Sequence, residues 1–172
     1  MIEIRPEQPG DEEAIAEINR RAFGGEEEVG IIGAIRKSEF FIPELSLVAE
    51  SDGRITGHIM FSTISLFREG GPQENILSLA PMAVDPEEQN RGTGSALVRA
   101  GMEKARELGH RIVIVIGHPG YYPRFGFEQA RRNGFEIAFE VPDEAFMVAG
   151  LQPEALLDAG GMVQFTAPFN MH

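Results

Sequence analysis

Hydrophobic positions at the N-terminal end of the chain follow first a strand period and then a helix period. Ile2 and Ile4 predict a short strand. A helix is expected to begin at Asp11, which can cap it, and to stop at Gly24-Gly25. Its inward positions are Ile15, Ile18 and Ala22. A second helix is expected from about Glu26 to Lys37. The inward positions of this helix are Val29, Ile32 and Ile35.

The next segments have the composition and alternation of β-strands. One strand is expected at Leu45 to Glu50 and a longer one at Ile55 to Phe67. Asp52-Gly53 between them is typical of a two-residue hairpin turn. A third strand is expected at Ile76 to Val84. It contains Pro81, which cannot donate a ladder hydrogen bond, so we expect a bulge or a local parting from the neighbouring strand.

A glycine turn and a helix follow this third strand. The helical period runs from Ser95 to Leu108, and Gly109 closes it. Its inward positions are Leu97, Gly101, Met102, Ala105 and Leu108. The run Ile112 to Ile116 is continuously β-branched, which is typical of a strand buried on both faces. Strand, helix and strand predict a right-handed parallel β-α-β unit.

The C-terminal part mixes short elements. Tyr121 to Gly126 predicts a short helix or turn, and strands are expected at Ala145 to Leu151 and Met162 to Thr166. A short helix is expected at Pro153 to Ala159 between them. The length of 172 residues suits one domain spanning 1–172. The fold class is therefore α/β (α+β), a mixed central sheet with a parallel β-α-β core flanked by helices.

Composition narrows the possible functions. The chain has no cysteine, which excludes disulfides, zinc-cysteine sites and a cysteine nucleophile and fits a cytoplasmic protein. We find no signal-peptide pattern and no apolar run of membrane-spanning length. The net charge of -12 disfavours nucleic acid as a partner. An acidic surface tolerates cationic partners such as amines, or it serves only to keep the protein in solution.

The stretch Val84 to Ser95 predicts an anion site. Its glycines let the backbone approach a ligand, and free N–H groups at the start of the following helix favour negative charge. A bound diphosphate would fit such a turn. The Walker motif is excluded because the last glycine is not followed by a lysine and then Ser/Thr. The dinucleotide fingerprint is excluded because the third glycine is absent and several strands precede the turn.

Three motifs give the chain a family resemblance. Gln89 to Gly94 fits the Q/R-x-x-G-x-G/A signature of the GNAT superfamily of N-acetyltransferases. Leu79 to Pro86 resembles the fourth strand of that family, and Tyr122 to Phe127 fits its Y-x-x-x-G-F ending. Gly120 to Phe127 and Val141 to Met147 resemble the bacterial YhbS-like branch. The motifs occur in the family's order, so the resemblance implies a GNAT-type acyl-CoA N-acyltransferase fold over nearly the whole chain.

The resemblance implies acetyl-CoA as the co-substrate. Its diphosphate would lie on backbone N–H groups of seven consecutive residues, Gln89, Asn90, Arg91, Gly92, Thr93, Gly94 and Ser95. The pantetheine arm would pair with the backbone of Met82, Ala83 and Val84, whose side chains are expected in the core. Tyr122 matches the general acid that protonates the CoA thiolate; the alternative is an aromatic that only packs. Tyr121 is one residue out of register and is expected to pack.

No motif identifies the general base. Family members often use a strand glutamate or a water chain, but Ile76 to Val84 carries no acid and only Ser78. His118 stands at the end of a buried strand, where it could relay a proton. The expected role is instead to cap the strand and donate to backbone. His118 also occupies a position where many relatives carry a CoA-contacting asparagine.

Other charged residues carry weaker hypotheses. Glu26-Glu27-Glu28 borders the acceptor site in this family and could attract a cationic amine. We expect instead that the three glutamates are solvated acids at the start of a helix, where the helix dipole favours them. His58 and His110 are expected at the surface or in turns. No His/Asp/Glu cluster has metal-binding spacing, so no metal is expected.

Together these observations predict an acetyl-CoA-dependent N-acetyltransferase. The acetyl group would pass to a primary amine by direct attack in a ternary complex. One alternative is a non-catalytic acyl-CoA-binding sensor or regulatory module, which the missing strand acid leaves open. Another is an enzyme that uses a longer acyl donor or a peptide acceptor. The identity of the amine and the choice between monomer and homodimer stay open.

Overall fold

A single mixed sheet organises the molecule. The computed structural model describes residues 1–170, and in them nine strands form one sheet in the order β1-β2-β3-β4-β5-β8-β6, with β9 paired to β3 and β7 to β9. The strands are β1 Glu3–Pro6, β2 Phe41–Ser51, β3 Arg54–Phe67, β4 Glu74–Val84, β5 Ile112–Ile116, β6 Glu128–Gln129, β7 Phe135–Ile137, β8 Phe146–Gly150 and β9 Gly161–Gln164. The pair β4 and β5 is parallel, as the sequence predicts for the β-α-β unit.

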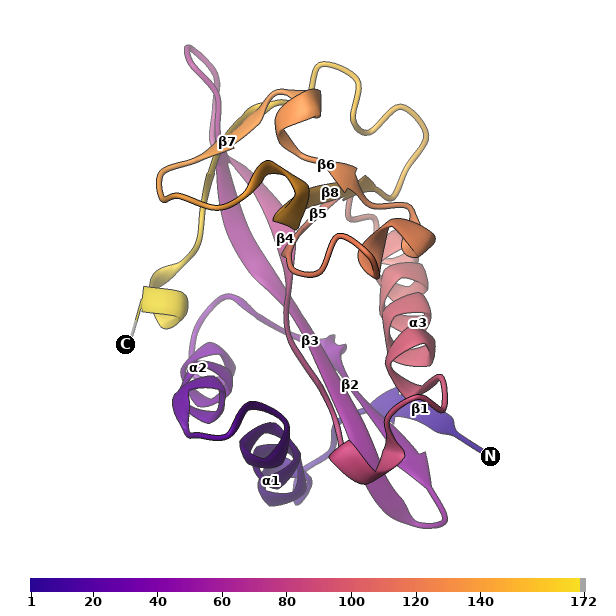
Figure 1. Cartoon of the computed structure of the whole chain (residues 1–172). Coiled ribbons are helices and arrows are strands. Elements are labelled where there is room, and N and C mark those ends of the chain that lie inside the picture. The colour runs from indigo at the N-terminus through magenta and orange to yellow at the C-terminus, as the bar shows by residue number, and fades with distance from the viewer. Residues whose placement is uncertain (171–172) are drawn as a thin grey trace.

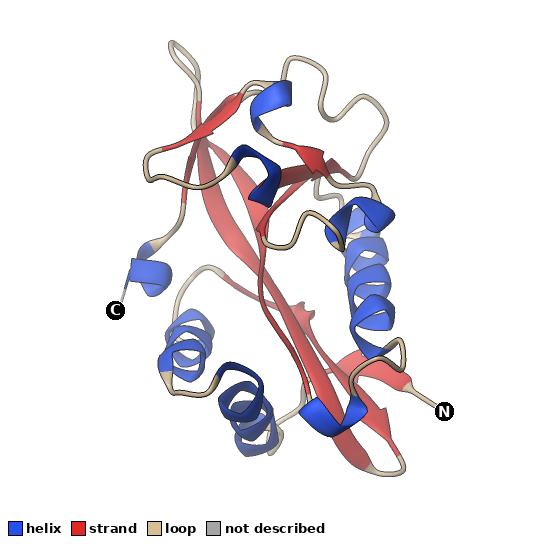
Figure 2. Cartoon of the chain, in the orientation of Figure 1, coloured by secondary structure: helices blue, strands red, loops and turns tan. Residues whose placement is uncertain are grey.

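Helices cover both faces of this sheet. Figures 1 and 2 show α1 and α2 on one face and α3 on the other. The α-helices are α1 Glu12–Phe23, α2 Glu27–Arg36 and α3 Thr93–Glu107. Short 3-10 helices are η1 Pro86–Glu88, η2 Tyr122–Phe125, η3 Arg131–Asn133, η4 Asp143–Ala145 and η5 Ala167–Asn170. Within residues 1–170, every helix is too short or too polar to span a bilayer.

The side chains of successive β3 residues pack into two different hydrophobic cores, one on each face of the sheet. Ile59 and Phe61 pack with Leu97 on the α3 face, whereas Met60 packs with Ile32 on the α1 and α2 face. This alternation is the two-residue period of a strand covered on both sides. The α3 face is packed so closely that a Cβ atom at Gly101 would lie 2.2 Å from Cε1 of Phe61. Glycine therefore lets α3 approach the sheet.

Strand β4 separates from β5 after a short contact. The two strands are paired only at Leu77 with Val113 and at Ser78 with Ile114. On its other side β4 stays paired with β3, but the register shifts by one residue between Leu79 and Met82, where Pro81 lies. The bulge predicted from Pro81 is therefore confirmed. Beyond it, β4 leaves β5 and opens a gap within the sheet.

Most predicted elements are present, but four sequence-based expectations are wrong. Leu108 follows the last turn of α3 and is 40% exposed, so it is not an inward residue. The Asp11 carboxylate makes no capping bond and instead accepts hydrogen bonds from Arg5 and from the Gln8 N–H. His58 is fully buried in β3. The fourth is the helix expected at 153–159.

The segment 153–159 forms successive turns instead of a helix. Glu154 and Asp158 have φ angles of 62° and 55°, in the left-handed region that a right-handed helix cannot contain. The N–H groups of Ala155 and Leu157 bond to carbonyls three residues back, as in turns.

Candidate active site

The gap between β4 and β5 opens into a long cleft. The cleft has a volume of about 1120 Å³ and extends from the start of α3 to the α1–α2 side of the sheet. Residues of β4, of the turn before α3, of the end of β5 and of η2 line it, together with Phe23, Glu28 and Phe169. Sites for small molecules usually measure about 300–1,000 Å³. The cleft is therefore large enough for an extended ligand and a second molecule.

A buried carboxylate fixes the turn between β4 and α3. Asp85 is 1% exposed and accepts hydrogen bonds from Arg21 at 3.0 Å, Arg54 at 3.1 Å and the Glu87 N–H at 3.0 Å. Burial by itself would raise the pKa of this carboxyl. The Glu87 N–H and the two guanidinium groups outweigh burial and lower the pKa below its usual value. Asp85 therefore stays ionised and holds the turn against β3 and α1.

The start of α3 presents free donors to the cleft. Its first helical hydrogen bond joins the Ala96 N–H to the Gly92 carbonyl, so the N–H groups of Thr93, Gly94 and Ser95 have no partner within the helix. Asn90 and Gly92 adopt left-handed φ angles of 65° and 82°, which turn the chain into the helix. Three unpaired donors at the positive end of a helix dipole form a site for an anion.

Most of the residues predicted to bind a diphosphate line this cleft. They are Gln89, Asn90, Gly92, Thr93, Gly94 and Ser95. Arg91 does not line it: its side chain is exposed and pairs with Glu88 at 3.2 Å. The Gln89 amide reaches the Val84 carbonyl at 3.5 Å, which ties the turn to the end of β4.

Backbone direction separates the three predicted residues of β4. The Asp85 N–H donates to the Thr56 carbonyl of β3. Because backbone groups alternate in direction along an antiparallel strand, Ala83 also faces β3, while Met82 and Val84 face away from it. Ala83 contributes its small side chain to the cleft wall, but its backbone groups point to β3. Only Met82 and Val84 offer backbone groups to a ligand in the gap.

Tyr122 is the buried aromatic of the cleft. It is 9% exposed, its ring meets Tyr121 edge-on at 5.1 Å between centroids, and it packs on Phe127 at 5.7 Å. Burial, together with a smaller contribution from the neighbouring Tyr121, raises the pKa of the Tyr122 phenol to about 12. The phenol is therefore protonated throughout the physiological range and can serve as a proton donor.

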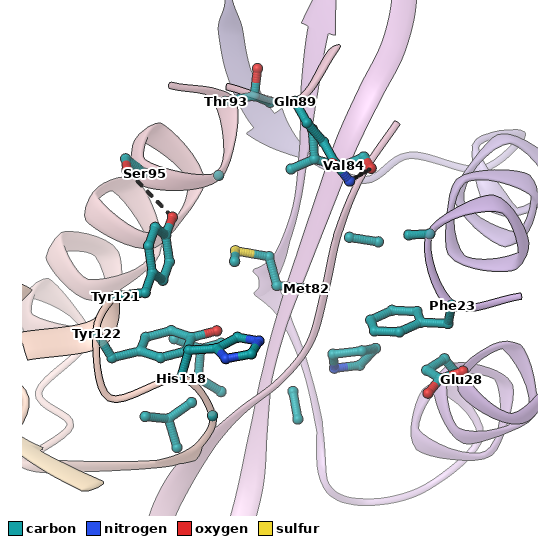
Figure 3. Close-up of a pocket in the computed structure, with 18 of the residues that line it drawn as sticks. Phe23, Glu28, Met82, Val84, Gln89, Thr93, Ser95, His118, Tyr121 and Tyr122 are labelled. Atoms are coloured by element: carbon teal, nitrogen blue, oxygen red, sulfur yellow. Dashed lines mark hydrogen bonds between the residues drawn. The ribbon is translucent and has the colours of Figure 1, made fainter. Parts of the chain in front are cut away.

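Tyr121 joins η2 to α3, as expected for a packing residue. Its hydroxyl lies 3.3 Å from the Ser95 hydroxyl, and Figure 3 shows this bond at the side of the cleft. The guanidinium of Arg124 lies 4.8 Å from the centre of the Tyr121 ring. A Cβ atom at Gly94 would lie 3.0 Å from the Tyr121 hydroxyl oxygen, so a glycine leaves room for this contact.

The opposite wall comes from α1, α2 and the C-terminal η5. Phe23 and Glu28 point into the cleft from this side, facing His118 at the end of β5 (Figure 3). Of the three glutamates predicted near an acceptor, Glu28 alone lines the cleft, and Glu26 pairs with Arg20 at 2.5 Å. The sequence motifs did not mark Phe23 or Phe169. Both lie outside these motifs, and only the tertiary fold places them on one cleft.

His58 and His110 do not line the cleft. His58 was expected at the surface, but it is buried, and its Nε2 atom lies 3.0 Å from the Ser46 hydroxyl. His110 lies half-buried in the turn after α3. Within residues 1–170, no group of three His, Asp or Glu side chains is placed to hold a metal ion.

Comparison with other sequences finds a family match that includes the glycine turn and Tyr122. The model of the family described as the acetyltransferase (GNAT) domain matches residues 3–130. The uncharacterized N-acetyltransferase YjhQ of Escherichia coli K12 is 39% identical over 136 residues, which cover 78% of this chain and 74% of that protein. The uncharacterized N-acetyltransferase YhbS of the same strain is 32% identical over 168 residues, covering 97% and 98%.

Solved structures agree with the sequence comparison. The crystal structure of Escherichia coli YhbS in complex with CoA has a TM-score of 0.89 at 31% identity, covering 98% of this chain and 92% of that one. A GNAT family acetyltransferase from Brucella melitensis in complex with acetyl-CoA has a TM-score of 0.79 at 32% identity, covering 98% of each chain. The predicted GNAT-type fold and the resemblance to the YhbS-like branch are confirmed. The chain belongs to the acetyltransferase (GNAT) domain family.

Proposed function

We propose that the protein transfers the acetyl group of acetyl-CoA to a primary amine by direct attack, with both substrates held in one complex. The observation that carries this proposal is the continuous cleft from the free N–H groups of α3 to Tyr122. Two relatives support the donor, because YhbS was solved with CoA and the Brucella protein with acetyl-CoA. The N-acetyltransferase names of the relatives support the reaction.

The donor would extend along the cleft from the glycine turn. Its diphosphate fits the unpaired N–H groups of Thr93, Gly94 and Ser95, where the helix dipole favours negative charge. Its pantetheine arm would lie in the gap and pair with backbone groups of Met82 and Val84, in the manner of an added strand. In this arrangement the thioester would lie at the bulge, beside Met82 and toward Tyr122.

The reaction forms a C–N bond and breaks a C–S bond. The amine lone pair attacks the thioester carbonyl, and the negative charge that develops on its oxygen is stabilised by a donor of β4, for which the Met82 N–H faces the gap. Tyr122 then protonates the departing thiolate, for which its raised pKa keeps the phenol protonated. A covalent intermediate on cysteine is excluded because the chain has none.

The acceptor would enter from the wall formed by α1, α2 and η5. Phe23, Ile31 and Phe169 make this wall largely apolar, and Glu28 adds one carboxylate. Such a wall fits an amine whose body is apolar and whose charged end is drawn toward the carboxylate. The wall faces the end of the cleft where the thioester would lie.

The proposal is tested by thiol release from acetyl-CoA beside calorimetric acetyl-CoA binding. A suitable panel contains benzylamine, phenethylamine, spermidine, kanamycin and a peptide with a free N-terminus and one lysine. We expect acetyl-CoA to bind and at least one amine to accelerate release above the rate without amine. Binding without amine-dependent release would contradict the proposal and indicate a sensor. Faster CoA release from a longer acyl-CoA than from acetyl-CoA would indicate that the longer acyl-CoA is the donor.

A further inference from the structure

The proposed reaction needs a group that removes a proton from the acceptor's ammonium, and the cleft offers few. Its titratable and charged lining side chains are Glu28, Glu88, His118, Tyr121, Tyr122 and Arg124. Glu88 already binds Arg54 at 3.0 Å and Arg91 at 3.2 Å beside the glycine turn. The Tyr121 hydroxyl contacts Ser95. Since Tyr122 is the proposed acid and arginine stays protonated, Glu28 and His118 are left.

The backbone places His118 next to the proposed acid. The His118 carbonyl accepts the N–H of Tyr121 at 3.1 Å and the N–H of Tyr122 at 3.4 Å. His118 and Tyr122 are therefore the two ends of one hydrogen-bonded turn, and both residues line the cleft. In a tetrahedral intermediate, nitrogen and sulfur are bonded to the same carbon. A base for one and an acid for the other must therefore lie close together, as two residues of one turn do.

The imidazole of His118 is free to act. Its side chain is exposed and points into the cleft in Figure 3. Within residues 1–170, neither ring nitrogen has a hydrogen-bond partner, so the ring does not cap β5 by donating to backbone. The turn thus fixes the backbone of His118 and leaves its side chain unengaged. A histidine used only as a strand cap would have its ring nitrogen bonded.

We propose that His118 is the general base of acetyl transfer, taking a proton from the acceptor's ammonium before the nitrogen attacks. This inference rests on the proposed function. Imidazole suits the task because one ring nitrogen of a neutral histidine can accept a proton while the other carries one. Glu28, on the opposite wall, attracts the cationic acceptor without removing its proton.

The protons balance across the two residues. The nitrogen loses two protons in the whole reaction. The first passes from the ammonium to a ring nitrogen of His118 and from that exposed ring to solvent. The second leaves as the amide forms and returns Tyr122 to its protonated state after Tyr122 has given its proton to the CoA sulfur. The products are the N-acetylated amine and CoA thiol, and no oxidant or further reactant is required.

The test compares pH profiles of kcat/KM for four proteins: wild type, His118→Gln, Glu28→Gln and His110→Gln. The acceptor is the amine of the panel that gives the fastest release. His110 is the matched control because it is a histidine at the opposite end of α3 that does not line the cleft. Acetyl-CoA affinity, measured by calorimetry, checks that each variant is folded and binds the donor.

We expect His118→Gln to lower kcat/KM about 100-fold at neutral pH and to remove the fall of activity on the acid side. Added imidazole should restore part of the activity of His118→Ala. Glu28→Gln should raise KM for the amine and keep the acid-side fall, and His110→Gln should match wild type. The inference is overturned if His118→Gln retains full activity, or if the acid-side fall disappears in Glu28→Gln instead. A wild type that releases no CoA with any amine would instead refute the proposed function.

Discussion

The α-carbon of Gly117 lies against the ring of Tyr122. A Cβ atom at position 117 would be 2.6 Å from Cε2 and 3.2 Å from Cδ2 of that ring. Atoms cannot approach so closely, so the last residue before His118 must be glycine for the phenol to keep its place. Because Gly117 has no side chain, the Tyr122 ring can pack directly against the backbone after β5.

This contact predicts the effect of Gly117→Ala. The added methyl group should displace the phenol and lower kcat about 10-fold or more, because small misplacements of a reacting group are costly. Acetyl-CoA affinity should change little, since the glycine turn lies at the other end of the cleft. Gly30→Ala is the control, because a Cβ atom there meets no neighbour within 4 Å. Steady-state kinetics with unchanged kcat in Gly117→Ala would contradict the positioning role.

Tyr122→Phe should lower kcat about 100-fold and leave acetyl-CoA affinity within a factor of about two. The acid works only when protonated, so its contribution is lost as pH rises through its pKa of about 12. Wild-type activity should therefore show no alkaline fall attributable to Tyr122 below about pH 11. Kinetics across this range, with calorimetry on both proteins, provide the measurement. Equal turnover of the two proteins would remove the acid role.

Gly92→Ala should weaken acetyl-CoA binding about 10-fold, because the residue has a φ angle of 82° and adjoins the free N–H groups of α3. Gly109→Ala is a matched control: it has a φ angle of 90° after the other end of the same helix, outside the cleft. Both substitutions should cost about 1 kcal/mol of stability. Calorimetric affinities that fall equally in both variants would show that strain alone, and not the anion site, explains the loss.

His58 gives the protein a stability that depends on pH. Burial, and then the charge of Arg36, lowers its pKa from 6.5 to about 3 in the folded state. Between these values the unfolded chain binds a proton that the folded protein does not. Stability is therefore fully present above about pH 6.5 and falls as the pH decreases, by up to about 1.4 kcal/mol per pH unit.

His58→Gln should remove this dependence. Urea unfolding at about pH 5 and about pH 7.5 should show a smaller difference between the two conditions in the variant than in wild type. His110→Gln, with a half-buried ring, serves as the comparison. An unchanged pH dependence in His58→Gln would mean that the buried imidazole is not the titrating group.

The local motifs of the sequence predicted the glycine turn, the bulge at Pro81 and the position of Tyr122, because each depends on residues close together in the chain. The opposite wall could not be predicted in this way. Phe23 and Phe169 lie at distant positions in the sequence and line the same cleft only when α1 and η5 cover the same face of the sheet. Burial of His58 was missed for a related reason. Ser46 on the paired strand β2 accommodates its ring, and no pattern within β3 reveals that partner.

The most direct measurement of the central claim follows product and thiol together. Wild-type protein, acetyl-CoA and the fastest amine of the panel are mixed, and mass spectrometry quantifies the acetylated amine beside the CoA released. We expect one acetylated amine for each CoA, at a rate that Tyr122→Phe lowers about 100-fold without loss of acetyl-CoA binding. CoA release without acetylated amine, or acetyl-CoA binding with no release at all, would contradict the account.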